Sequence, residues 1–231
     1  MRIYKDAMEM VREVERDLWE MGIRVQSSTM QDKDVHDNKD YETVELQAYP
    51  YMITSWPDKN EMVEYLKGSI HWCRVELANR LSAKYLNPGT SWVVNEPLWQ
   101  EYLRDGQFSY TYNERLREQI DQLVRELQIR PTTRQAIITM YDRHQDMGNW
   151  GGKDRVPCSM YYQFYVRRGT LNMIYTMRSC DFLNHFVHDV WLALGLLEAV
   201  ASATGMKVGV FTHMIGSLHA YDKDMKARGI Y

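Results

Sequence analysis

The chain has 231 residues, 45% of them apolar, and a net charge of −3. That length fits one large domain, and the apolar share is enough to bury a core, so we expect a single domain over residues 1–231. The near-neutral charge argues against non-specific nucleic-acid binding. An anionic ligand would therefore have to be held by local arginines.

The cysteines and the N-terminus indicate the compartment. Cys73, Cys158 and Cys180 are odd in number and follow no CxxC or Cys/His metal spacing, which fits free thiols in a reducing compartment and no metal site. The N-terminal segment is charged and amphipathic rather than a signal peptide, and no apolar run reaches the roughly 18 residues of a membrane span. We expect a cytoplasmic protein without a membrane or nucleic-acid partner.

The first third of the chain alternates helical and extended patterns. Apolar residues recur every three or four positions from Tyr4 to Met21, which predicts an amphipathic helix. The polar stretch 24–40 is predicted to be a loop, and its length suggests a function. Next come a strand over Thr43–Tyr49, helices from about Glu61 and over Ile70–Leu81, and a turn at Asn87-Pro88-Gly89.

The rest of the chain predicts an α+β protein with a mixed sheet. Residues 89–115 are rich in tryptophan and tyrosine without regular periodicity, and are either a satellite of the core or a platform for a flat ligand. The later elements are a helix over Leu116–Leu127, strands over Ala136–Tyr141, Met160–Val166 and Leu171–Met177, a helix over Val190–Ala203, and a strand over Val208–His213.

Cys158 is the candidate nucleophile. A cysteine attacks only as the thiolate, whose formation a nearby arginine favours. Arg155 lies three residues earlier, and Arg178 and Arg134 could approach from elsewhere. A lone cysteine is more often a small buried apolar residue, so the spacing alone leaves both roles open.

Three further patterns could contact a ligand. Arg178-Ser179 offers a guanidinium fork and a hydroxyl to a phosphate, although an arginine ending a strand is the commoner case. Asp189 precedes an apolar helix, where a carboxylate usually caps exposed N–H groups. His219 and Tyr221 alternate and would point to one side of a strand, either toward a sugar hydroxyl or into a half-buried layer.

Taken as a series, these residues resemble a known family. The order Pro157-Cys158, Gln163-Phe164-Tyr165-Val166, Arg178-Ser179-Cys180-Asp181 and His219-Ala220-Tyr221 is similar to the Pro-Cys-His, Gln-Phe-Tyr-Val, Arg-Ser-x-Asp and His-x-Tyr motifs of thymidylate synthases. The spacing from Arg178 to Gly205 matches without a gap. Weaker similarity covers the stretches 61–68, 99–102, 110–112 and 133–135.

The resemblance implies a thymidylate synthase-like fold, with one sheet face forming a homodimer interface, and a folate-dependent reaction on a pyrimidine nucleotide. Cys158 would add to C6 of the base, and C5 would attack the one-carbon unit of 5,10-methylenetetrahydrofolate. By the same resemblance, the phosphate would be held by Arg178, Ser179 and, from the other subunit, Arg134, and the sugar by His219 and Tyr221. Glu61 would organise water for proton transfer, Tyr112 would lie near the C5 proton, Gln163 would belong to the substrate site, and Asp181, Trp99 and Tyr102 would face the folate. Arg24 is the expected further phosphate ligand, with Arg130 as the alternative.

One departure from the family pattern concerns the base. Asp189 stands where synthases acting on uracil carry asparagine. An amide complements the O4 acceptor and N3–H donor of uracil, whereas a carboxyl group that shares one proton with N3 complements the amine and N3 acceptor of cytosine. The same change marks the deoxycytidylate hydroxymethylases of T-even-like phages, which the chain therefore resembles most.

Other departures favour hydroxymethylation over methylation. Ser159 replaces the histidine after the cysteine, Tyr102 replaces a tryptophan, and Val187-His188 replaces Pro-Phe. The chain also ends soon after Tyr221, where typical synthases continue into a tail that closes over the folate, so we expect water rather than hydride to complete the reaction. The alternatives are a methyltransferase acting on dUMP or dCMP, a CMP hydroxymethylase, and an inactive homologue that binds nucleotide or RNA.

Overall fold

A computed structural model describes residues 1–151 and 153–230, and their strands form a mixed sheet in the order β1-β5-β9-β8-β7-β6, with β2 also paired to β5. β8 pairs parallel to β9 and β1 parallel to β5, whereas the remaining pairs in this sheet are antiparallel. The strands are β1 (Arg2–Tyr4), β2 (Ile23–Gln26), β5 (Glu42–Ile53), β6 (Ile137–Thr139), β7 (Ser159–Arg167), β8 (Thr170–Asp181) and β9 (Lys207–Tyr221), with a separate hairpin of β3 (Thr29–Met30) and β4 (Lys33–Asp34). The predicted α+β class with a mixed sheet is confirmed.

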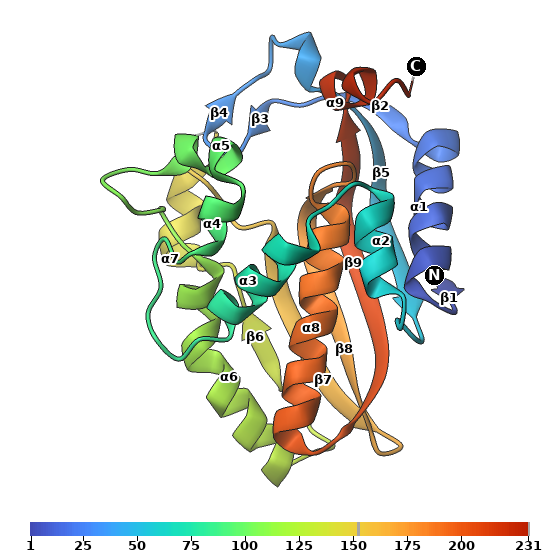
Figure 1. The fold of residues 1–231 in the computed structure, drawn as a ribbon, viewed down its shortest axis with the longest axis vertical. Coiled ribbons are helices and arrows are strands. Elements are labelled where there is room, and N and C mark those ends of the chain that lie inside the picture. The colour runs from blue at the N-terminus through green and yellow to red at the C-terminus, as the bar shows by residue number, and fades with distance from the viewer. Residues whose placement is uncertain (152, 231) are drawn as a thin grey trace.

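The longer helices lie against one face of this sheet (Figure 1). They are α1 (Ala7–Met21), α2 (Lys59–Tyr65), α3 (Ile70–Arg80), α6 (Tyr112–Ile129) and α8 (Phe186–Thr204). The short elements are α4 (Ser91–Val94), α5 (Glu96–Trp99), α7 (Arg143–Asp146), α9 (Asp222–Ala227), η1 (Lys39–Tyr41), η2 (Gln100–Tyr102) and η3 (Met147–Asn149).

The central helix α8 is apolar almost all round. By length and composition it could cross a membrane, but 67% of its apolar window is buried within the protein, as in a core helix. α3 packs closely against it at Gly195, where an added Cβ would lie 2.6 Å from Cδ2 of Leu77. This close approach brings the side chains of α3 next to the first turns of α8.

A row of stacked rings runs across the helix-covered face of the sheet. Tyr162, Tyr175, His213 and Tyr51 are direct cross-strand neighbours on β7, β8, β9 and β5. The ring of Tyr175 stacks on that of Tyr162 at 4.4 Å and on that of His213 at 4.7 Å. Tyr51 meets His213 edge-on, and its hydroxyl lies 2.8 Å from Nδ1 of His213. Because burial lowers the pKa of His213 to about 3, this imidazole is neutral and acts as a structural ring.

The opposite face of the sheet is less covered. Its paired positions include Ile137, Gln163 and Ile174, and a neighbouring row carries Met214. Ile137 and Met214 keep exposed fractions of 44% and 39%. Apolar side chains of this size on an open sheet face are compatible with the expected subunit interface, which stays a prediction.

Several elements extend beyond their predicted limits. The last strand continues to Tyr221, so His219 and Tyr221 are themselves part of β9. α8 begins at Phe186, which places Asp189 inside the helix, where its N–H bonds to the carbonyl of His185; the expectation that Asp189 caps the helix was therefore wrong. The stretch 24–40 is not a plain loop, because its polar residues form β3 and β4 and part of β2.

Candidate active site

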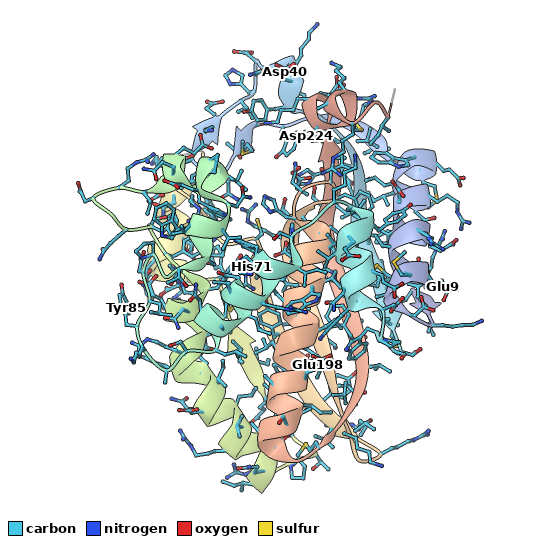
Figure 2. All side chains as sticks on the ribbon, viewed as in Figure 1. Glu9, Asp40, His71, Tyr85, Glu198 and Asp224 are labelled. Carbon is cyan, nitrogen blue, oxygen red and sulfur yellow. The ribbon has the colours of Figure 1, made fainter. Side chains whose placement is uncertain are left out.

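A cavity of about 890 Å³ lies where the parallel strands β8 and β9 end. Carboxyl ends of neighbouring parallel strands meet at the same edge of a sheet, a common place for ligands. The cavity is closed by the start of α8, by α3, by the aromatic stretch 97–112 and by the β3–β4 hairpin, and Figure 2 shows Asp224 of α9 at this end of the molecule. Its lining includes the predicted residues Trp99, Tyr102, Tyr112, Cys158, Arg178, Ser179, Asp181, Asp189, His219 and Tyr221.

Cys158 lies in this cavity immediately before β7. Its Sγ is 3.8 Å from Nη2 of Arg178 and 3.9 Å from Nε2 of Gln31. The Arg178 guanidinium also donates to the carbonyls of Val156 and Pro157, both at 2.9 Å, so it fixes the backbone that carries the thiol. Burial raises the pKa of the Cys158 thiol, and the positive charges of Arg178 and Arg155 act against that shift.

Asp189 faces the same cavity from the first turns of α8. Its Oδ2 is 3.8 Å from Sγ of the buried Cys180. Burial raises the pKa of this carboxyl, while the positive charge of Arg80 acts in the opposite direction. A carboxyl group that holds its proton more firmly than usual can donate from one oxygen and accept with the other.

A second carboxylate in the cavity, Glu76 of α3, was not among the predicted site residues, and its negative charge adds to the effect of burial in raising the pKa of Asp189. Glu76 accepts from Nε of Arg80 at 2.7 Å and from the hydroxyl of Ser91 at 2.6 Å. The Arg80 guanidinium lies 4.2 Å from the ring centre of Tyr112. The only signal in the sequence was the i, i+4 spacing of Glu76 and Arg80, which usually marks a solvated helix surface.

The strand ends supply neutral hydrogen-bonding groups. His219 and Tyr221 have ring centres 5.0 Å apart, and the hydroxyl of Ser217 lies 3.3 Å from Nδ1 of His219. Burial lowers the pKa of His219 and raises that of Tyr221, so both side chains are uncharged near neutral pH. Asp181 accepts from the backbone N–H groups of residues 183 and 184, at 3.1 and 3.2 Å, and from the Asn184 side chain at 2.9 Å, and so shapes the turn after β8.

Three of the predicted site residues, Glu61, Gln163 and Arg134, lie outside the cavity. Glu61 is exposed on α2, whose buried positions are Met62 and Val63, and it faces α1 across a smaller pocket; its assignment to the water network was therefore wrong. Gln163 donates to the backbone carbonyl of Arg134 at 3.0 Å on the helix-free face of the sheet. Arg134 itself is exposed at the start of the β6 edge, and its reach into a second subunit stays a prediction.

The early loop does not supply the expected phosphate arginine. Arg24 lies on β2 and forms an ion pair with Asp222 at the start of α9. The alternative, Arg130, pairs with Glu126 at the end of α6, and neither residue lines the cavity. β2 turns the Arg24 side chain toward α9 because the strand pairs with β5 through residues 23–26, which no pattern in the sequence indicated.

The residue of the early loop that does lie beside the nucleophile is Gln31. Its amide N–H groups face the thiol, its Oε1 is buried without a partner among the described residues, and its backbone has a φ of 54° at the hairpin turn. Because a hydrogen bond to sulfur stabilises the thiolate, Gln31→Met is expected to raise the Cys158 pKa and slow alkylation by iodoacetamide at fixed pH by up to about tenfold.

The alkylation rate would be followed on the Cys158 peptide by mass spectrometry from pH 6 to 10. Lys33→Met serves as the control, because it removes the ion pair between the same hairpin and Glu101 without touching the thiol. Equal slowing in both variants would show that Gln31 acts only by holding the hairpin in place.

A thiol next to an arginine, a buried carboxyl group with a raised pKa and an aromatic wall surround one cavity. These groups suit an enzyme that performs covalent chemistry on a flat, anionic heterocycle. A family model described as thymidylate synthase matches residues 26–228. The chain belongs to the thymidylate synthase family.

Individual relatives agree with that assignment. A protein of Methanosarcina barkeri described as "Putative thymidylate synthase" is 33% identical over 148 residues, which cover 58% of this chain and 65% of that protein. Among solved structures, thymidylate synthase A of Bacillus subtilis superposes with a TM-score of 0.71, covering 96% of this chain and 82% of its own, and that of phage T4 with 0.69, covering 96% and 79%. Both are 18% identical to this chain, so they establish the fold alone.

Proposed function

We propose that this protein is a folate-dependent pyrimidine nucleotide hydroxymethylase that converts dCMP to 5-hydroxymethyl-dCMP. The observation that carries the proposal is Asp189: a carboxyl group with a raised pKa lies in the same cavity as the nucleophile Cys158. A buried site recognises a base by pairing each hydrogen-bond donor of the base with an acceptor and each acceptor with a donor. A protonated carboxyl group offers the acceptor and the donor that the 4-amine and N3 of cytosine require.

The nucleotide would be held by groups at the strand ends. Arg178 and Ser179 of β8 are adjacent and line the cavity next to Cys158, as a phosphate site requires. His219 and Tyr221 offer neutral donors and acceptors for the sugar 3′-hydroxyl. In this pose the cytosine 4-amine donates to one oxygen of Asp189, and a single proton is shared between the other oxygen and N3.

Covalent activation is the task of Cys158. Its sulfur adds to C6 of the cytosine, the C5–C6 double bond opens, and C5 gains the electron density needed to attack an electrophile. Loss of the C5 proton would expel the folate amine from the one-carbon unit and leave a methylene group on C5. Water would then add to this methylene carbon while the C6–S bond breaks, which regenerates the thiolate beside Arg178. Glu76 and Tyr112 line the cavity and would transfer these protons, with Glu76 in the role expected of Glu61.

The aromatic wall fits a folate co-substrate. The ring centre of Trp99 lies 6.1 Å from that of Tyr102 and 6.0 Å from that of Phe108, and all three residues line the cavity. Such rings suit a flat pterin. Asp181 lines the same cavity. When bound, 5,10-methylenetetrahydrofolate supplies a one-carbon unit at the oxidation level of formaldehyde, so addition of water completes hydroxymethylation without a hydride.

The reaction itself tests this proposal. Purified protein incubated with dCMP, formaldehyde and tetrahydrofolate is expected to yield 5-hydroxymethyl-dCMP by chromatography, with no rise in near-ultraviolet absorbance from dihydrofolate. A rise in that absorbance together with a 5-methyl product would identify a methyltransferase. Parallel reactions with CMP and dUMP measure the preference for sugar and base.

The homodimer belongs to the same proposal. The half-covered sheet face would form the interface, and Arg134 would reach the phosphate of the neighbouring subunit. Mixing two inactive variants, Cys158→Ala and Arg134→Ala, tests this arrangement: a mixed dimer has one intact site, so partial recovery of activity is expected only if Arg134 acts across the interface.

A further inference from the structure

Arg155 is a buried cation enclosed by aromatic rings. Its exposed fraction is 8%, and its guanidinium carbon lies 4.8 Å from the ring centre of Tyr110, 5.2 Å from that of Trp99 and 5.4 Å from those of Tyr102 and Phe108. All four rings come from the aromatic stretch that walls the cavity, and Arg155 itself lines that cavity. The residue is therefore held rigidly at the cavity surface.

Contacts with aromatic rings leave the hydrogen-bond donors of a guanidinium group unpaired. Aromatic faces attract the charge, but the five N–H donors at the edge of the group still require acceptors. Within residues 1–151 and 153–230, the Arg155 side chain makes no hydrogen bond and no ion pair. A buried charge without a counter-ion is costly, so a site that keeps one usually meets its partner in a ligand.

The side chains of the other arginines in the cavity all have hydrogen-bond acceptors within the protein. Arg80 is paired with Glu76, and Arg228 donates to the carbonyls of Leu66 and Leu183 at 3.2 and 2.6 Å. Arg178 is occupied by backbone carbonyls but also has no carboxylate partner among the described residues. Arg155, on the segment that leads to Cys158, and Arg178, near the end of β8, thus carry positive charges without a carboxylate partner among the described residues, and both act to lower the pKa of the Cys158 thiol.

We propose that Arg155 binds an oxyanion of a bound ligand and forms, with Arg178, a two-arginine site beside Cys158. This inference rests on the proposed function for the identity of the ligands. A phosphate monoester carries a charge of about −1.5 to −2 near neutral pH, which balances two guanidinium groups, whereas a carboxylate balances one. The nucleotide phosphate is therefore the favoured source, and the glutamate carboxylate of the folate is the other ligand that carries the same chemistry.

Paired ligands with and without the oxyanion test the site by calorimetry. Arg155→Met keeps the apolar stem and removes charge and donors. We expect the Kd of dCMP and dUMP to rise by about ten- to a hundredfold, with that of deoxycytidine and deoxyuridine changing by less than about threefold. If the folate supplies the oxyanion, the same contrast appears between tetrahydrofolate and tetrahydropteroate, which lacks the glutamate.

Two controls keep the result specific. Arg155→Lys retains the charge but not the fork and should recover part of the affinity. Arg117→Met removes a guanidinium that lies 5.8 Å from the ring centre of Tyr85, outside the cavity, and should change no Kd. Thermal unfolding of each variant reports whether the aromatic stretch stays folded.

Equal losses with and without the oxyanion, or no loss in either pair, would overturn the proposal and make Arg155 a brace of the aromatic wall. The experiment includes both cytosine and uracil ligands. If the enzyme prefers uracil, the comparison of nucleotide with nucleoside affinity still reports on the phosphate. Wild-type protein that binds neither nucleotide would contradict the proposed function, and Arg155 would then be judged by the folate pair alone.

Discussion

Asp189→Asn is expected to reverse the base preference from dCMP to dUMP. The amide can donate to O4 and accept from N3–H of uracil, whereas with cytosine it leaves buried polar groups unpaired. Sites that depend on such bonds discriminate by on the order of 10⁴, so the ratio of kcat/KM for the two nucleotides should shift by about that factor. Release of tritium from 5-tritiated dCMP and dUMP measures both values in one assay.

The pH dependence provides a second measurement on the same residue. Burial raises the pKa of Asp189, and the complex with cytosine needs one proton between the carboxyl group and N3. Below the raised pKa the carboxyl group brings that proton. As the pH rises through this pKa, the free carboxyl group loses its proton, and the complex must take one up from solution. The affinity for dCMP therefore falls with rising pH. The asparagine variant binds dUMP without taking up a proton, so its affinity for dUMP should stay constant over the same pH range.

An unchanged preference would mean that another group recognises the base. His188 is a poor candidate, because its Nε2 accepts from the Ser69 N–H at 3.0 Å and its Nδ1 lies 3.1 Å from the carbonyl of Asn184. Burial also lowers its pKa to about 4, so it stays neutral. A main-chain group at the cavity end of α8 would then be the next residue to test.

Cys158→Ala is expected to abolish tritium release from C5. Without the C6–S bond, C5 is not nucleophilic, and loss of a covalent nucleophile lowers turnover by on the order of 10⁴ or more. Binding of dCMP should change little, since the phosphate, sugar and base contacts remain. Calorimetry separates the two effects.

Cys73→Ala is the matched control for this variant. Cys73 is buried on α3 and does not line the cavity. Substitution there should cost some stability and leave tritium release near the wild-type value. Tritium release that persists in the Cys158 variant would exclude covalent activation, and a wild-type protein that releases no tritium would favour the inactive binding homologue.

Most of the cavity residues that were predicted from the sequence lie at the ends of long, consecutive strands. Cys158, Arg178 and His219 sit at a strand start or at strand ends, and their spacing is fixed by the lengths of β7, β8 and β9. Once the strands are paired, such residues must meet at one edge of the sheet. Each pattern alone left a structural role open, and the resemblance to the family was what joined groups that are distant in sequence.

The residues that were missed depend on tertiary packing. Glu61 and Glu76 are both acidic positions on short helices, and only the rotation of each helix against the core decides which one faces the cavity. Gln31 and Arg24 lie in a stretch whose strands have only two to four residues, too few for the alternation of apolar and polar residues to mark a strand. Their directions are set by partners far away in the sequence, which a single sequence does not reveal.

The stacked row of rings has a consequence for heat inactivation. Ser159, the neighbour of Cys158, is fully buried, and its hydroxyl lies 2.5 Å from that of Tyr175 in the middle of the row. The nucleophile is thus attached to a fully buried part of the sheet, whereas its partner Gln31 comes from the turn of the small hairpin formed by β3 and β4. On warming, the β3–β4 hairpin should therefore unfold before the sheet that carries Cys158. A protein that has lost its activity in this way would still hold Cys158 in its native position.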